Sequence, residues 1–64
     1  MKNYSSKDVI KIIESNGWRF KDATGDHHHF VHDTIKGKVT IPHPVKSVPI
    51  FIVKIIGKQT GIKF

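Results

Sequence analysis

The spacing of the apolar residues changes twice along this chain, and that change restricts the fold to one order of elements. The first spacing is helical, with an apolar stripe on one side of residues 6–16: Val9, Ile10, Ile12 and Ile13. Ser5 and Ser6 are good N-caps, Asp8 suits the first turn, and Gly17 suits the stop. The pattern predicts a helix over residues 6–16.

A period of two replaces the helical spacing in the middle of the chain. Trp18, Phe20 and Asp22 alternate with Arg19, Lys21 and Ala23. Gly25–Asp26 is typical of a turn, and Phe30 lies in a second β-compatible run. A third strand is predicted over residues 38–41. Pro42 then ends the ladder, because proline has no N–H to donate.

Helical spacing returns after the prolines, where Pro49 suits a first turn and Gly61 a stop. The run Ile50–Val53 is also compatible with a strand, since periodicity cannot decide so short a segment; we favour the helix. The order α-β-β-β-α predicts an α+β fold in which two helices cover one face of a three-stranded antiparallel sheet. All of residues 1–64 belong to this single domain.

The strand phase predicts which side chains share each face of the sheet. Those expected to face the helices are Phe20, Phe30, Val39 and Ile41. Those expected on the open face are Arg19, Lys21, His27, His29, Val31, Lys38 and Thr40. The open face should therefore be basic and carry imidazoles.

Charge and composition favour a nucleic-acid partner. Eleven Lys and Arg against five Asp and Glu give a net charge of +6, which attracts polyanions, although lysine can also serve solubility alone. Without cysteine, disulfides and thiolate zinc sites are excluded. With no signal-peptide run, and Val48–Val53 too short to span a bilayer, we expect a cytoplasmic protein with no membrane partner.

Four histidines lie within six residues, at positions 27, 28, 29 and 32. Imidazole can accept and return a proton near neutral pH, as metal-free RNA cleavage requires, and His27 with Lys21 or Lys38 could meet that need. The alternatives are that these histidines are ordinary polar surface residues or that they form a zinc site. His28 shares the phase of Phe30, so we expect it to be partly buried and hydrogen-bonded. Because only two of the histidines share a face, we expect no metal and no cofactor.

Four segments resemble the HicA toxins, also called YcfA-like proteins. They read Gly17-Trp18, Gly25-Asp26-His27-His28-His29-Phe30-Val31-His32, Val39-Thr40-Ile41-Pro42-His43-Pro44 and Lys58-Gln59-Thr60-Gly61-Ile62. The resemblance implies a double-stranded-RNA-binding-domain-like fold, a ribonuclease that cleaves messenger RNA, and a HicB-like antitoxin that covers the active site. It also implies that His27 is the catalytic histidine, that Gly25 shapes the turn before it, and that Thr40 and His43 lie beside the site.

The chain departs from the family pattern in three places. Asp26 replaces the serine before the catalytic histidine, and its carboxylate could orient the imidazole or repel a phosphate. His29 is not the usual residue, yet it lies roughly 7 Å from His27 on one face, so we hypothesise that the two form an acid–base pair. The large residues of the run 50–52 replace the usual start of the second helix, and we expect some to contact an antitoxin or a second copy of the toxin.

Three functions follow from these residues. The first is a metal-independent endoribonuclease toxin that uses His27, with Lys21, Lys38 and Arg19 binding phosphates. The second is a module that binds structured RNA without cleaving it, for which a titrating His27 is not needed. The third is a toxin-derived structural partner that has lost its activity.

Overall fold

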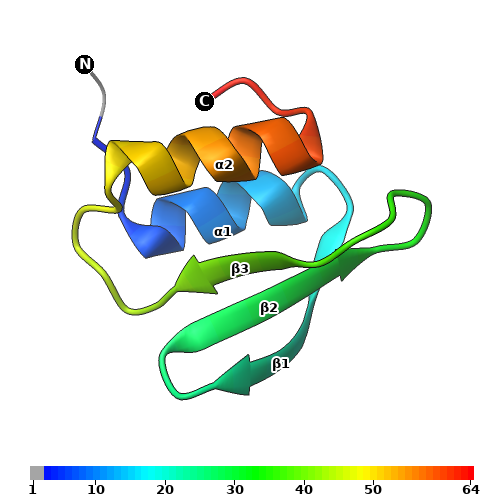
Figure 1. Ribbon diagram of the computed structural model, residues 1–64, viewed down its shortest axis with the longest axis horizontal. Helices are drawn as coiled ribbons and strands as arrows, with labels where there is room; N and C mark the ends of the chain where they lie inside the picture. Colours follow the sequence, from blue (N-terminus) through cyan, green and yellow to red (C-terminus); the bar gives the residue numbers. More distant parts are fainter. Residues whose placement is uncertain (1–2) are drawn as a thin grey trace.

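The computed structural model describes residues 3–64 and has the predicted order of elements (Figure 1). The elements are α1 (Ser6–Glu14), β1 (Trp18–Thr24), β2 (His27–His32), β3 (Val39–Pro42) and α2 (Ile50–Thr60). The strands form one antiparallel sheet in the order β1-β2-β3. α1 contacts β1 and β3, whereas α2 contacts β3, and β1 lies farthest from α2 (Figure 1). The α+β prediction is confirmed.

α1 begins where it was predicted and ends two residues earlier. Ser5 and Asp8 form a capping box, in which the Ser5 hydroxyl accepts the Asp8 N–H and the Asp8 carboxylate accepts the Ser5 N–H. Beyond the last turn, the side chains of Ser15 and Asn16 both donate to the carbonyl oxygen of Ile12, at 2.7 and 2.8 Å. Such side-chain bonds compete with helix continuation, which accounts for the shorter helix.

The β1–β2 hairpin turns at Gly25–Asp26, as predicted. Gly25 has a φ of 60°, whereas no residue other than glycine has a positive φ among those described, so Asp26 follows with a negative φ. This combination is that of a type II′ turn, whose first central position favours glycine.

A β-bulge interrupts the alternation of β1. Phe20 pairs with Phe30, but the next pair is Asp22 with His29, so Lys21 is an extra residue in the ladder. A bulge places two residues opposite one and shifts the phase of all that follow. As a result Asp22, not Lys21, occupies the position opposite His29 on the open face.

β3 is displaced by one residue from its predicted bounds. It runs from Val39 to Pro42, so Lys38 precedes the strand and Pro42 is its last member, paired with His27. Proline is tolerated there because β3 is an edge strand, where the missing N–H need not serve a second neighbour.

α2 confirms the helix that we favoured over a strand for residues 50–53. It follows Pro49 directly and ends at Gly61, which has a φ of 75° and donates its N–H to the Gly57 carbonyl at 2.8 Å. Glycine at the left-handed position after the last turn is the usual way to end a helix.

The core lies between the helices and the sheet. Its buried apolar members are Val9, Ile13, Trp18, Phe30, Val39, Ile41, Val48, Val53 and Ile56. Phe20 was expected among them, and it does lie on the helix side opposite Phe30, but it is 52% exposed. Neither helix extends far enough over β1 to cover it.

Candidate active site

His27 opens β2 directly after the hairpin turn and lies on the face of the sheet opposite to Phe30. Its side chain is 62% exposed, and its Nε2 atom lies 3.8 Å from Oδ1 of Asp26. That distance is too long for a hydrogen bond but allows attraction between the carboxylate and a protonated ring. An imidazole this exposed can contact a ligand bound on the open face without any rearrangement of the sheet.

His29 lies two residues further along the same face and is half-buried. It pairs across the sheet with Thr40, and its Nδ1 atom is 2.8 Å from the Thr40 hydroxyl oxygen. This bond fixes the ring and leaves Nε2 as the nitrogen available for proton transfer. The structure thus places His27, His29 and Thr40 together, as the strand phase predicted.

The cations expected to flank the imidazoles are arranged differently. Arg19 lies on the open face, but its guanidinium donates to Asp33 at 2.8 Å, and both side chains are largely exposed. Lys21 is the bulge residue and Lys38 precedes β3, so neither is paired with a residue of a neighbouring strand. The position of Asp22 opposite His29 was not predicted, although two consecutive polar residues, Lys21 and Asp22, break the alternation at the bulge.

His43 touches the hairpin turn through its backbone and the helix layer through its ring. Its N–H donates to the Asp26 carbonyl at 2.7 Å, whereas its Nδ1 atom lies 2.7 Å from the hydroxyl oxygen of Ser6. Ser6 is 1% exposed, and it also exchanges hydrogen bonds with the backbone of Val45. The ring of His43 therefore belongs to the helix side, not to the open face with His27.

The role of Ser6 was not predicted from the sequence. A serine in the first turn of a helix is ordinary, and only the packing of the β3–α2 loop against α1 shows that its hydroxyl connects the two.

His28 is half-buried, as expected, but its surroundings are aromatic. Its ring lies 5.6 Å from that of Phe20 and 5.0 Å from that of His43. The predicted hydrogen bond to this imidazole is wrong for the described part of the chain, where the ring is held by a tilted contact with Phe20 and an edge-on contact with His43.

His32 supports the fold. Its Nε2 lies 3.1 Å from the carbonyl oxygen of Asn16, its Nδ1 accepts the Thr34 N–H at 3.1 Å, and its ring packs against Trp18 at 5.2 Å. Both ring nitrogens are thereby engaged by the neighbouring loops, so His32 is structural.

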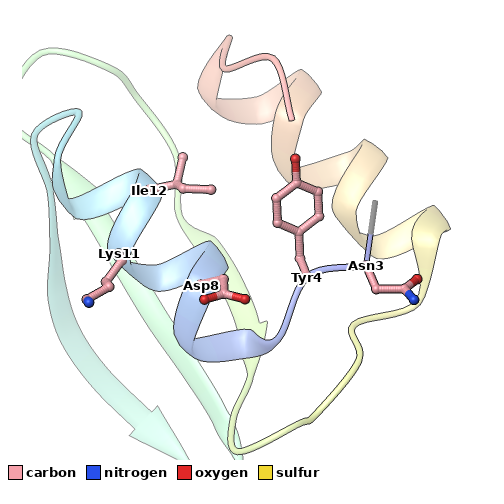
Figure 2. A pocket seen from close by; sticks show the side chains of 5 residues that line it. All are labelled: Asn3, Tyr4, Asp8, Lys11 and Ile12. Carbon is pink, nitrogen blue, oxygen red and sulfur yellow. The ribbon is translucent and has the colours of Figure 1, made fainter. Parts of the chain in front are cut away.

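The described residues include a groove away from His27 and His29 but no cluster of metal ligands. Over residues 3–64, no three His, Cys, Asp or Glu side chains form a group that could hold a metal ion. A groove of about 320 Å³ lies on the helix side and is lined by five residues: Asn3, Tyr4, Asp8, Lys11 and Ile12. Figure 2 shows that these side chains come from α1 and the segment before it, so the groove contains none of the histidines.

None of the helices in the described part could cross a membrane.

The chain matches a known protein family. Residues 6–62 match the family model described as the HicA toxin of bacterial toxin–antitoxin systems. The chain belongs to the HicA toxin family. The match covers all five elements of the fold and therefore includes the histidines at positions 27, 28, 29 and 32. Membership of the family implies a toxin role and an antitoxin of the HicB type as partner. No curated protein matches the chain significantly.

Proposed function

We propose that this HicA-family toxin is an endoribonuclease that cleaves messenger RNA with His27 and His29 as an acid–base pair and without a metal ion. The observation that carries the proposal is the placement of two imidazoles on one open strand face, one exposed and the other fixed by Thr40. Membership of the toxin family supports it.

The chemistry requires two proton transfers around one phosphate. The ribose 2′-oxygen attacks the phosphorus and loses its proton to one imidazole, while the other imidazole protonates the departing 5′-oxygen. A bond forms between the 2′-oxygen and phosphorus, and the bond from phosphorus to the 5′-oxygen breaks. The products are a 2′,3′-cyclic phosphate and a 5′-hydroxyl end.

Two side chains support this pair of histidines. The Thr40 bond keeps His29 in one orientation during the reaction. The Asp26 carboxylate, 3.8 Å from His27, attracts the imidazolium that forms when His27 takes up a proton. Arg19 is exposed on the same face and can bind a phosphate, and Lys21 and Lys38, exposed beside the paired strands, can do the same.

The test is cleavage of an end-labelled messenger RNA by the purified protein in EDTA, with the product ends identified. We expect the wild type to leave cyclic phosphate and 5′-hydroxyl ends, His27→Ala to lose about 100-fold or more in rate, and His29→Ala to lose rate with an altered pH profile. Lys36→Ala, which removes an exposed charge elsewhere, is the control and should cleave like the wild type.

The outcomes separate the alternatives. Equal cleavage by wild type and His27→Ala would assign the chemistry to another residue. An unchanged rate and pH profile in His29→Ala would remove His29 from the pair. RNA binding without cleavage would favour the non-catalytic RNA-binding module, for which the net charge of +6 is the supporting observation.

We further propose that α2 provides a contact for the HicB-like antitoxin. Three of its large apolar side chains are exposed, with Ile50 at 45%, Phe51 at 62% and Ile55 at 51%. Their side-by-side exposure on a small protein is typical of a binding surface. Lys54 lies within this stretch of α2. In a contact between two toxin copies the two Lys54 charges would repel each other, whereas an acidic partner would attract them.

Replacing Phe51 by serine should weaken antitoxin binding at least tenfold without lowering the melting temperature, because the side chain lies outside the core. Gln59→Ser, on an exposed position of the same helix, is the matched control. Normal antitoxin binding by Phe51→Ser would refute the proposal, and a loss of self-association instead would identify a second copy of the toxin as the occupant.

A further inference from the structure

Three aromatic rings form a row on the helix side of the sheet, beyond the part that the helices cover. They belong to Phe20 on β1, His28 on β2 and His43 after β3, and we call them the ring row. The ring centroids of Phe20 and His28 are 5.6 Å apart, and those of His28 and His43 are 5.0 Å apart. The proposed acid–base chemistry uses none of these three side chains.

Phe20 is exposed because of its place in the sheet. Phe30, directly opposite it, is 2% exposed beneath the helices, whereas Phe20 on the outer strand is 52% exposed. β1 is the strand farthest from α2 (Figure 1). A single exposed aromatic side chain is common on protein surfaces, so the exposure of Phe20 gains meaning only from the rings and charges that lie beside it.

The row is also held rigidly at both ends. The ring of Phe20 rests edge-on against Phe30 at 5.9 Å. At the other end, Nδ1 of His43 lies 2.7 Å from the hydroxyl of buried Ser6. Rings fixed in this way can receive a flat ligand without first losing conformational freedom.

Cationic side chains continue the row beyond His43. A hollow of about 450 Å³ is lined by His43 together with two exposed lysines, Lys7 on α1 and Lys46 on the β3–α2 loop. Aromatic faces next to positive charges suit a ligand with flat rings and a negatively charged backbone, which is the pattern of proteins that bind single-stranded nucleic acid.

We propose that the ring row is a stacking site for a base of single-stranded RNA, a few nucleotides from the cleaved phosphate. The proposal rests on the proposed ribonuclease function for the identity of its ligand. A protein partner is less suited, because Phe20 is the one large apolar side chain exposed in the row and standard protein interfaces bury about 800 Å² per partner.

The RNA reaches both sites by passing around the hairpin tip. His27 and His28 are consecutive in β2, so they face opposite sides of the sheet at the same end. The tip between the two sides is formed by Gly25 and Asp26, and a side chain at Gly25 would meet nothing within 4 Å. Phe20 pairs with Phe30, three residues or about 10 Å along β2 from His27, so a strand whose phosphate lies at His27 can place a base a few nucleotides away on Phe20.

The test measures RNA binding by Phe20 variants in the His27→Ala background, so that cleavage does not consume the probe. The probes are a fluorescein-labelled single-stranded uridine octamer and the same octamer with abasic sugars. We expect Phe20→Leu to weaken uridine octamer binding about tenfold or more, and Phe20→Trp to stay within about twofold of the parent. Binding of the abasic octamer should be the same for all three proteins.

Each result decides the question. Unchanged binding by Phe20→Leu, or equal weakening by Phe20→Leu and Phe20→Trp, would overturn the stacking site. Weakened binding of the abasic octamer by Phe20→Leu would show damage to the fold rather than loss of stacking, and would equally overturn it. Cleavage by the wild type is measured separately, so an inactive protein whose Phe20→Leu variant binds weakly would reject the ribonuclease and retain the stacking site.

Discussion

Replacing Gly17 by alanine tests whether the turn between α1 and β1 is built around the ring of His32. Gly17 has a φ of 94°, and a Cβ added there would lie 2.7 Å from Nε2 of His32. Gly37 has a similar φ of 102°, but a Cβ there would meet nothing within 4 Å. Both substitutions strain the backbone, and only the one at Gly17 must also displace the imidazole.

The magnitude follows from these two costs. A left-handed conformation costs an L-residue about 1–2 kcal/mol, which applies to both variants. Displacing His32 also loses its bonds to the Asn16 carbonyl and the Thr34 N–H, each contributing about 1 kcal/mol. Gly17→Ala should therefore lower the free energy of unfolding by about 3–4 kcal/mol, against about 1–2 kcal/mol for Gly37→Ala. That is a large share of the roughly 3–10 kcal/mol expected for a domain of this size.

Thermal and urea unfolding followed by circular dichroism measure the difference. A gap of about 2 kcal/mol corresponds to roughly 8–16 °C in melting temperature for so small a domain. In a His32→Ala background the gap should disappear, because no ring remains to be displaced. Equal costs for Gly17→Ala and Gly37→Ala in the wild-type background would refute the reasoning, as would a gap that persists without His32.

Three further predictions concern polar contacts. Ser6→Ala should lower the free energy of unfolding by about 1–3 kcal/mol, because it removes the buried hydroxyl that bonds to the ring of His43 and the N–H of Val45. A free energy of unfolding, measured in urea, that stays within about 0.5 kcal/mol of the wild type would be that of an ordinary surface substitution and would contradict this. Asp33→Ala should change stability by less than about 1 kcal/mol, yet strengthen RNA binding by freeing Arg19; weaker binding in a filter assay would argue otherwise. Thr40→Val should slow RNA cleavage about 10- to 100-fold by releasing His29, with rescue by Thr40→Ser, and should add nothing in a His29→Ala background. An equal loss in that background would assign Thr40 a merely structural role.

The elements with the clearest local chemistry were predicted well. α1 has its capping serine and apolar stripe, the hairpin has glycine at the turn, and α2 has Gly61 at its end. Each of these signals acts within a few residues, so it can be read without knowing what lies across the core. The pairing of His27 and His29 on one face likewise follows from the strand period alone.

The errors occur where distant segments meet. The bulge at Lys21 depends on how β1 pairs with β2, and it exchanges a lysine for Asp22 beside His29. The exposure of Phe20 depends on how far the helices extend over the outer strand. The pairing of Arg19 with Asp33 joins residues whose separation in sequence gives no local signal.

Three properties can be read from the amino-acid sequence without a structure: the order of the elements, the face that carries His27 and His29, and the resemblance to the HicA toxins. They depend on local periodicity and on motifs that are contiguous in the chain. The neighbours of those imidazoles, the bond between Ser6 and His43 and the exposure of Phe20 become visible only in the folded molecule. Register, bulges and helix coverage result from packing the whole core at once, so they depend on residues far apart in the chain.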